Sequence, residues 1–421
     1  MNFYSSALYT APLLGTWELY LLWRQRRVKS RTDSVPKDFE KVLTADEFAD
    51  AQRYESDSLA VRIGCQIKDI AIGVLGVAFK VQSFLYKATR DVFALPEASF
   101  THCLMYSVAG DLLTTLIDLP FAYYNTFVVE QKHGFNKQSK GDFFLDQLKW
   151  FLVRVTLFHT TQTWLIKFVF NRYGERFPLY LFSGFTTILI LFSFIYPAVI
   201  MPMFNKFTPL NDDGPLYARI RDLAKSLNYP LKSVYEMDGS RRSGHSNAFL
   251  YGFWNNKSIV LFDTLLKQLN DDQILAVLSH ELGHWYHNHT LKMLIVPVAQ
   301  LYAICQGART VIFNEEMYRQ FGFDRVDPVV GFDIFAQVFL SPIMLLVGYG
   351  IVQYVKYNEY QADRFAVRKG YGKALKEALV VLLKENKKDC TQDPLYSLLH
   401  NTHPVPSERI RAIDAEMNKC A

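Results

Sequence analysis

An uncharged stretch over residues 177–205 constrains the fold of this 421-residue chain more than any other feature. It lies between Arg176 and Lys206, and about 20 consecutive apolar residues are enough for a helix to cross a bilayer. Residues 334–355 form a second uncharged stretch, and residues 293–308 form a shorter third one. These stretches predict a membrane-embedded body, although the length alone would suggest two or three soluble domains.

Four more segments are apolar but contain isolated charges, and together with the uncharged stretches they predict about seven transmembrane helices. The segments, with their charges, are 7–23 (Glu18), 70–86 (Lys80), 103–129 (Asp111 and Asp118) and 150–170 (Arg154 and Lys167). A charge inside a membrane helix is costly and usually faces a protein interior or water. The alternative for the last three segments is a set of amphipathic soluble helices.

Positive charge near the N-terminus predicts the topology. Arg24, Arg26 and Arg27 directly follow the first apolar segment, whereas a signal peptide carries its positive charge before the apolar run. We therefore expect a retained first helix whose C-terminal end lies on the cytosolic side. The formal net charge of +5 suits contact with an anionic bilayer and is too weak to indicate a nucleic-acid partner.

Two polar regions separate and follow the membrane segments. In the first, residues 247–251 and 258–262 are apolar and β-prone, and Gly252 with Asn255 and Asn256 predicts the turn of a β-hairpin. The second polar region is mostly helical by its pattern. The predicted division is 1–205 (transmembrane helices 1–5), 206–290 (protease region), 291–355 (transmembrane helices 6 and 7) and 356–421 (C-terminal helical region).

A metal-binding motif lies in the first polar region. Asn270 is expected to cap a helix that carries His280 and His284 on one face, one turn apart, where both imidazoles can reach one tetrahedral zinc. Glu281 is placed to take a proton from a water molecule that the zinc activates. Gly283 costs this helix about 1 kcal/mol relative to alanine, which a close approach by zinc or substrate backbone would explain. The motif predicts a zinc-dependent peptidase with one zinc per chain.

A catalytic zinc needs a third protein ligand. The extended pattern H-E-x-x-H-x-x-G-x-x-H fails, because positions 287 and 290 are His and Thr. His287 lies on the ligand face and stays open as an alternative, whereas His289 is expected to be solvated or at the membrane surface. Glu359 is the better candidate, since it shares a predicted helix face with Asp363. Asp363 would then accept a hydrogen bond from a ligand imidazole.

Further segments extend these motifs along the chain. The set comprises 130–138 (EQKHGFNKQ), 243–253 (SGHSNAFLYGF), 259–266 (IVLFDTLL), 277–285 (VLSHELGHW), 359–363 (EYQAD), 396–400 (YSLLH), 402–404 (THP) and 407–412 (SERIRA). In this order, and over nearly the whole chain, the set resembles the CAAX prenyl protease 1 family of gluzincin-type membrane peptidases. The loop and strand segments separate this family from other membrane zinc peptidases, which share mainly the metal motifs.

The resemblance implies an all-α multi-pass membrane protein. About seven transmembrane helices would enclose a water-filled chamber, with a small gluzincin-like zinc protease region that contains the β-hairpin. The implied activity is removal of the C-terminal tripeptide from prenylated CAAX proteins, with a second, N-terminal cut in a prenylated precursor in some members. The implied location is the endoplasmic reticulum membrane, and in animals also the inner nuclear membrane.

The resemblance also implies roles for single residues. His280, His284 and Glu359 are the implied zinc ligands, and Glu281 is the implied base. Asp363 matches a position often assigned as a proton donor, but we favour an orienting role because Glu281 already moves protons. His403 matches a histidine that hydrogen-bonds the tetrahedral oxyanion, with helix capping before Pro404 as the alternative.

Substrate contacts are implied less specifically. Asn247 and Ala248 match a strand edge whose backbone pairs with an extended substrate. Arg241 or Arg242 would meet the substrate carboxylate, although plain surface charge is an equal alternative. Two other functions compete: a membrane quality-control metalloprotease, which would cut misfolded or stalled unprenylated polypeptides at comparable rates, and a non-enzymatic channel or scaffold, for which zinc would be dispensable.

Overall fold

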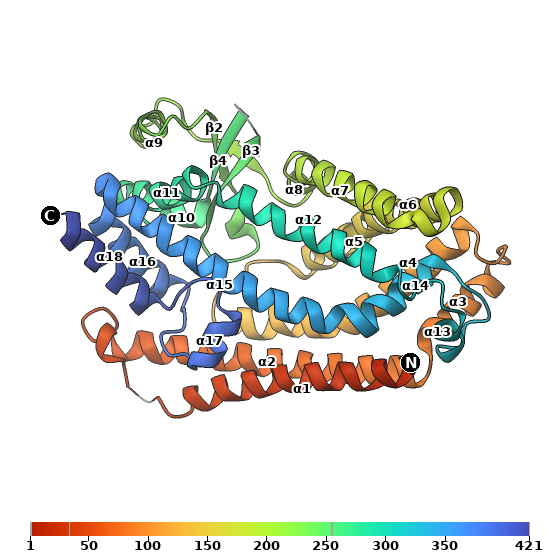
Figure 1. Ribbon diagram of the computed structural model, residues 1–421. Coiled ribbons are helices and arrows are strands. Elements are labelled where there is room, and N and C mark those ends of the chain that lie inside the picture. The colour runs from red at the N-terminus through yellow and green to blue at the C-terminus, as the bar shows by residue number, and fades with distance from the viewer. Residues whose placement is uncertain (1, 33, 254–255, 421) are drawn as a thin grey trace.

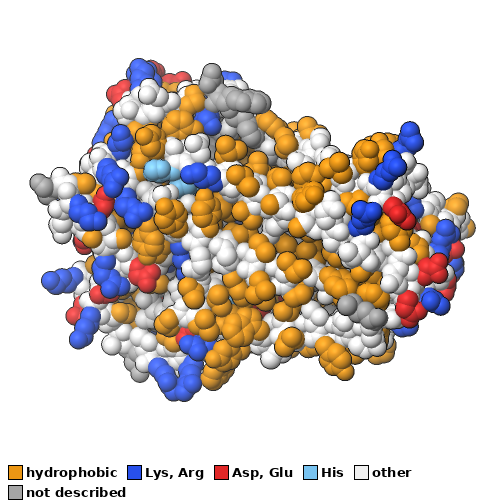
Figure 2. Space-filling view, viewed as in Figure 1, with side chains coloured by type: hydrophobic (Ala, Val, Ile, Leu, Met, Phe, Trp, Pro, Cys, Tyr) orange, Lys and Arg blue, Asp and Glu red, His pale blue; other side chains and the backbone are white. Residues whose placement is uncertain are grey.

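The structure is a computed structural model that describes residues 2–32, 34–253 and 256–420. The molecule is elongated, and its longest helices run along the long axis (Figure 1). Hydrophobic side chains cover the middle of the face shown in Figure 2, while charged side chains gather at its two ends. An apolar belt between two charged ends is the surface expected of a protein that spans a bilayer.

The expected membrane segments are all helical, with one interruption described below. They correspond to α1 (Phe3–Lys29), α2 (Ala45–Ala78) with α3 (Val81–Val92), α4 (Phe100–Tyr124) with η2 (Asn125–Glu130), α5 (Lys140–Val153) with η3 (Arg154–His159) and α6 (Thr160–Tyr173), α7 (Phe177–Ile195) with η5 (Tyr196–Ile200) and α8 (Met201–Phe204), α12 (His289–Ala308), and α14 (Pro328–Phe335) with η7 (Ala336–Leu340) and α15 (Ser341–Ala366).

The number of membrane passages depends on how bends are treated. By length and hydropathy alone, four helical stretches of the described ranges could cross a membrane, or five if the bent pair of α2 and α3 is one span. One of the four, Lys140–Phe204, reverses at η4 (Gly174–Arg176), so that α6 packs back against α7. With the bent pair counted as one span, the reversal within Lys140–Phe204 raises the number of passages from five to six. Helix α1, which lies along α2 (Figure 1), is the expected seventh.

The expected span over residues 70–86 is wrong as a continuous helix. α2 ends at Ala78, α3 begins at Val81, and the two axes are bent by 65°. Lys80 at the break has a left-handed backbone with φ of 50°, a conformation that a right-handed helix cannot contain. The helix before the break extends back to Ala45 instead, over residues too polar to signal a span.

The most apolar parts of two membrane stretches are little buried within the protein. In the most apolar windows of Phe100–Glu130 and Lys140–Phe204, only 6% of the residues are buried within the protein. Apolar side chains that are not buried within the protein are available to lipid on the outside or to an interior space between the helices. The expected chamber is such an interior space.

Several charges inside the apolar segments have polar partners, as expected for groups that face protein rather than lipid. Arg154 Nε donates to Asp111 Oδ1 at 2.9 Å. The Tyr349 hydroxyl donates to Glu18 at 2.5 Å, and Lys68 pairs with Asp118. Each of these charges therefore meets a partner from another helix.

A four-stranded sheet lies at one end of the helical body. Its strands are β1 (Phe207–Pro209), β2 (Leu231–Met237), β3 (Ala248–Phe253) and β4 (Asn256–Phe262), in the order β1-β2-β4-β3. The antiparallel pairing of β3 with β4 confirms the predicted hairpin, and Gly252 takes a φ of 110°; turn residues 254 and 255 lie outside the described residues. β2, which pairs parallel to β4, was not predicted.

The 130–138 segment supports the strand at the sheet edge. Gly244 N donates to Phe135 O at 2.9 Å, and Lys137 N donates to Arg242 O at 3.1 Å. The Tyr54 hydroxyl of α2 donates to Glu130 at 2.7 Å. These bonds tie a loop of the membrane body to the residues directly before β3, and so hold the edge of the sheet in place.

The remaining helices are η1 (Lys37–Phe39), α9 (Pro215–Ser226), η6 (Gly239–Arg241), α10 (Asp263–Gln268), α11 (Asp271–Tyr286), α13 (Glu315–Gln320), η8 (Val367–Tyr371), α16 (Gly372–Glu385), α17 (Pro394–His400) and α18 (Pro406–Cys420). Most of them lie near the sheet or along α15, whereas α13 lies near α3 at the opposite end of the molecule (Figure 1). α15 runs through the predicted boundary at 355/356 without a break. The last membrane passage and the proposed third zinc ligand therefore belong to one helix.

Candidate zinc site

Helix α11 presents the two histidines of the motif. It begins with a capping box, in which Asn270 accepts from Gln273 N while the Gln273 side chain accepts from Asn270 N. Its apolar side packs against the sheet in a buried cluster that includes Leu278 and Leu282. His280 and His284 then lie one turn apart, with their Nε2 atoms separated by 3.2 Å.

Helix α15 brings a carboxylate to these two nitrogens. Glu359 Oε1 lies 3.3 Å from His284 Nε2, and Glu359 Oε2 lies 3.6 Å from His280 Nε2. One ligand atom from each of the three residues lies within 4.8 Å of the others. The alternative ligand His287 follows the last residue of α11 and lines a separate surface pocket instead.

The crossing of α11 and α15 explains Gly283, but not as the sequence suggested. A Cβ atom at Gly283 would lie 3.2 Å from Ala362 Cα and 3.2 Å from Phe365 Cβ. The close approach is thus made by the backbone of α15, and the expectation of an approach by zinc or substrate was wrong. The small residue lets the helices approach until ligands from both meet.

Replacing Gly283 by alanine should therefore lower the melting temperature, despite the better helix propensity of alanine. Overpacking a well-packed contact costs about 1–3 kcal/mol, and the nearest atom is a backbone Cα that cannot rotate away. Gly64→Ala in α2 is the matched control, since nothing lies within 4 Å of its added Cβ. Equal melting temperatures for the two variants would contradict this account of Gly283.

Each histidine has an acceptor at its other ring nitrogen. His280 Nδ1 lies 2.9 Å from Asp363 Oδ1, an ion-pair distance, although the ring N–H is not aligned for a hydrogen bond. A carboxylate beside this nitrogen favours the proton there, which leaves the Nε2 lone pair for the metal position. Asp363 is held in turn by Arg409, which donates Nε at 2.8 Å and Nη2 at 2.6 Å. This geometry favours the orienting role over the proton-donor role.

His284 is oriented by a residue that the sequence reasoning misplaced. His289 is buried, with its Nδ1 2.9 Å from His284 Nδ1 and its Nε2 2.9 Å from Gln361 Oε1. Since the Gln361 oxygen only accepts, the protons lie on His289 Nε2 and His284 Nδ1, which again leaves His284 Nε2 free for a metal. The expectation of a solvated His289 was wrong, because the left-handed backbone of Asn288 (φ 55°) breaks the helix between α11 and α12 and leaves the His289 ring against His284. An asparagine at this position was the available signal.

Glu281 takes part in none of these hydrogen bonds. Within the described part of the chain its carboxylate forms no hydrogen bond or ion pair. Burial raises the pKa of Glu281, while His280 and His284 oppose that rise. A carboxyl group with a raised pKa holds an abstracted proton better, which suits a group that must take up and return one.

His403 lies beside the ligand Glu359. Its Nδ1 is 2.7 Å from Glu359 Oε2, and its side chain is 58% exposed. The carboxylate accepts, so Nδ1 carries a proton and the neutral ring has only an acceptor at Nε2. His403 could therefore donate to an oxyanion through Nε2 only as the imidazolium.

The sheet edge carries the two expected substrate-binding residues. Asn247 O accepts from Phe262 N, so by the alternation of antiparallel strands the backbone groups of Ala248 and Leu250 point to the free edge. At present the Asn247 side chain accepts from Ala248 N at 2.9 Å. An incoming strand would replace that contact.

Neither of the two arginines near this edge is free. Arg241 donates to Asp142 at 2.7 Å, and Arg242 forms a two-pronged pair with Asp146 at 2.8 and 3.1 Å. A substrate carboxylate would have to compete with these aspartates. The structure brings Arg242 and Asn247 into the lining of one cavity, so Arg242 is the better placed of the two.

The residues fit a catalytic zinc. Two imidazoles and one carboxylate are the protein ligands of zinc sites that keep a fourth position open for water or substrate. Here both lone pairs and the carboxylate converge within 4.8 Å, and the outer nitrogens have the partners that fix ligand imidazoles. His280, His284 and Glu359 would hold the metal.

The chain is similar to known proteins over nearly its whole length. Residues 211–417 match the peptidase family M48, and residues 24–206 match the family described as CAAX prenyl protease N-terminal, five membrane helices. A CAAX prenyl protease 1 homolog of Arabidopsis thaliana is 38% identical, covering 96% of this chain and 95% of its own length. The homolog of Homo sapiens is 32% identical, with 94% and 92% covered. The crystal structure of S. mikatae Ste24p aligns with a TM-score of 0.93 at 30% identity, over 98% of this chain and 99% of that one.

Proposed function

The chain belongs to the CAAX prenyl protease 1 family of M48 metallopeptidases, and we propose that it removes the C-terminal tripeptide from prenylated CAAX proteins at a zinc site between α11 and α15. The observation that carries this proposal is the convergence of His280, His284 and Glu359 beside Glu281, whose carboxylate has no partner among the described residues. A multi-pass membrane enzyme of this family acts on lipid-modified substrates, and we place it in the endoplasmic reticulum membrane.

The residues of the site have separate roles in peptide hydrolysis. When bound, zinc supplies Lewis-acid chemistry, lowering the pKa of water towards about 7 and polarising the scissile carbonyl. Glu281 takes the proton from the attacking water and returns it to the leaving amine. Asp363 and His289 hold the two ligand imidazoles in position. His403, as the imidazolium, donates from Nε2 to the developing oxyanion.

Substrate recognition follows from the sheet edge. An extended peptide adds to β3 as a further strand and exchanges hydrogen bonds with Ala248 and Leu250. Pairing with this edge does not depend on the side chains of the substrate peptide, because backbone groups form the hydrogen bonds. Selectivity for the prenyl group must then come from the apolar surroundings, and this is testable with matched peptides.

We expect a farnesylated CAAX peptide to be cut after its modified cysteine, and the unmodified peptide to be cut at least about tenfold more slowly. A buried isoprenoid contributes well over the 1.4 kcal/mol that a tenfold change represents. The measurement is release of the tripeptide by the purified full-length chain, with and without a chelator and after zinc is restored. Comparable turnover of both peptides would favour a membrane quality-control protease instead.

Asp363→Asn and His289→Ala should each weaken zinc binding by about 10–100-fold, the usual effect of removing a contact that orients a metal ligand. Activity should then return when zinc is raised. Metal content and activity measured across a zinc titration test this. If Asp363→Asn keeps its zinc but stays inactive at saturating metal, the proton-donor role is correct and the orienting role is not.

A further inference from the structure

The C-terminal end of the first membrane helix, α1, is bonded to the segment that connects α16 with α17. Gln25 of α1 is buried. Its Nε2 donates to Asp389 Oδ2 at 2.8 Å and to Thr391 O at 3.3 Å. Its Oε1 accepts from Asp393 N at 2.7 Å. One side chain of α1 therefore fixes three positions of the segment 389–393.

Two cations of α1 complete this arrangement. Arg24 pairs with both carboxylate oxygens of Asp393, at 3.0 Å each. Lys29 pairs with Asp389 and donates to Thr391 Oγ1 at 3.1 Å. Both aspartates are buried, and burying charged groups costs free energy that only good geometry offsets. Because a satisfied polar network fixes one arrangement of its members, these bonds set the position of the segment more narrowly than apolar packing would.

The segment held by α1 leads directly to His403. Asp393 caps α17, since its Oδ1 accepts from two backbone N–H groups of the first turn at 3.1 and 3.0 Å. Helix α17 contacts both α1 and α15 (Figure 1). After α17, the Asn401 side chain donates back to Gln392. Asn401 precedes His403 by two residues, so the start of the loop that carries this histidine is bonded to the segment that α1 holds.

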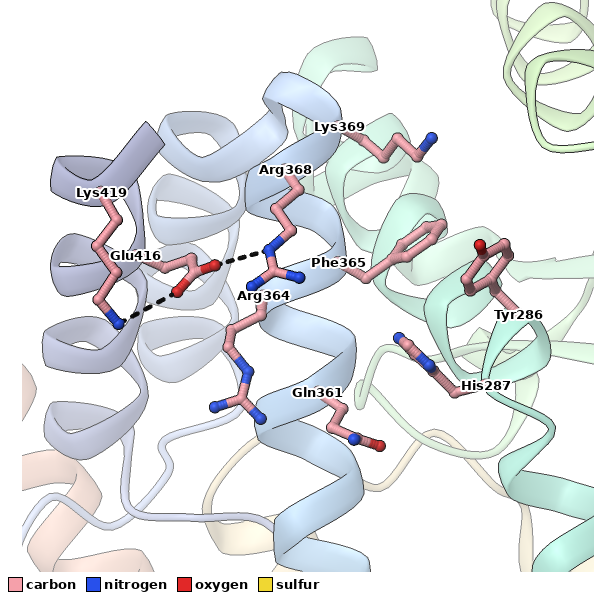
Figure 3. A pocket seen from close by; sticks show the side chains of 9 residues that line it. All are labelled: Tyr286, His287, Gln361, Arg364, Phe365, Arg368, Lys369, Glu416 and Lys419. Atoms are coloured by element: carbon pink, nitrogen blue, oxygen red, sulfur yellow. Dashed lines mark hydrogen bonds and ion pairs between the residues drawn. The ribbon is translucent and has the colours of Figure 1, made fainter. Parts of the chain in front are cut away.

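The other end of this loop is held by the ligand helix. α18 follows the loop and lies along α15 and its continuation η8. Arg409 of α18 forms two hydrogen bonds with Asp363 of α15. Further along, Glu416 of α18 accepts from Arg368 of η8 at 2.7 Å (Figure 3). The loop of residues 401–405, with His403 at its centre, is thus anchored to α1 through α17 at one end and to α15 at the other.

His403 depends on these anchors for its position. Its side chain is 58% exposed, and among the described residues its ring forms one hydrogen bond, to Glu359 Oε2 at 2.7 Å. The place of its Nε2 relative to a developing oxyanion is therefore set by the backbone of the loop. A displacement of about 1 Å is enough to slow a catalysed reaction by about 100-fold.

We propose that Gln25 is a positioning residue for His403. By holding residues 389–393 it fixes α17, and through α17 the loop that brings the imidazolium to the oxyanion. This role rests on the proposed function, in which His403 stabilises that oxyanion. Arg24 and Lys29 act on the same segment from the same end of α1, so the first membrane helix contributes to the reaction from outside the zinc site.

The test is a double-mutant cycle on cleavage of the farnesylated CAAX peptide by the purified full-length chain. Gln25→Leu keeps the approximate volume of the side chain but removes its three hydrogen bonds. We expect kcat to fall by about 10–100-fold, with KM changed by less than about twofold and zinc content unchanged. In a His403→Ala background the same substitution should change kcat by less than about twofold, because the group that it positions is gone.

The matched control is Gln162→Leu, which makes the same change at an exposed position of α6 and should leave kcat unaltered in both backgrounds. An equal fall for Gln25→Leu in both backgrounds would show that Gln25 supports the fold and not His403. Unchanged kcat in Gln25→Leu, or full activity of His403→Ala, would also overturn the proposal. The peptidase function itself fails only if Glu281→Gln stays active, so the two failures are distinguishable.

Melting temperatures show whether the variants fold. If Gln25→Leu does not fold, Arg24→Gln carries the same cycle, because the Arg24 side chain is 33% exposed and its loss breaks the pair with Asp393. We expect a fall in kcat of about tenfold for this variant, and again little change in the His403→Ala background. A fall of the same size in both backgrounds would overturn the proposal here too.

Discussion

Glu281→Gln should reduce cleavage of a farnesylated CAAX peptide by about 10²–10⁴-fold, the usual contribution of a positioned acid–base group, while zinc stays bound. The amide keeps the shape of the carboxylate but cannot take a proton from water. Because Glu281 makes no hydrogen bond or ion pair with the described residues, its replacement leaves the contacts of the metal ligands intact. The measurements are turnover number and zinc content of the same preparation.

The matched control is Glu377→Gln on the exposed surface of α16, which should keep full activity and full zinc content. Loss of zinc in Glu281→Gln would mean that this residue supports the metal rather than the proton transfer. Full activity would remove Glu281 from the mechanism altogether, and with it the proposed peptidase site.

Glu359→Gln should abolish both activity and tight zinc binding. The neutral amide is a poorer ligand than a carboxylate, and its NH₂ group can turn towards the two imidazole nitrogens that lie 3.3 and 3.6 Å from the present oxygens. The fall in zinc affinity should exceed the roughly 100-fold that loss of an orienting contact costs. Metal content after dialysis against a weak chelator measures it directly.

Thermal unfolding separates this loss from simple damage to the fold. A metal that binds only the folded state stabilises it according to concentration and affinity, so zinc should raise the melting temperature of the unmodified chain. In Glu359→Gln that rise should vanish, while the melting temperature without metal stays close to that of the unmodified chain. Glu385→Gln, exposed at the end of α16, should keep the zinc-dependent rise. A retained rise in Glu359→Gln would exclude Glu359 as a ligand.

Helical spacing was enough to predict part of this site. His280, Glu281 and His284 share one helix, and their relative placement follows from 3.6 residues per turn. The same local rule put Glu359 and Asp363 on one face of another helix. Two short β-prone runs, 247–251 and 258–262, with turn residues between them likewise predicted the hairpin, since a strand signal needs only near neighbours.

Contacts between distant segments were predicted less well. β2 was not predicted, because it pairs in parallel with β4, and the two strands are separated in the sequence by a segment that includes β3. Gly283 was explained by the wrong neighbour, because the backbone that approaches it belongs to α15. His289 was misplaced because a single left-handed residue, Asn288, sets the angle at which α12 leaves α11 and so decides where the His289 ring lies.

The uncharged stretches and the metal motif were determined by the sequence alone, because apolar length and helical periodicity are properties of a few consecutive residues. Only the tertiary structure decided which side chains complete the site. Glu359 reaches the histidines because Gly283 lets α15 approach α11 closely, and Asp363 and His289 set the tautomers of both ligands from outside their helix. Those contacts depend on the packing of a membrane helix against a helix of the protease region, and no local pattern encodes the distance between them.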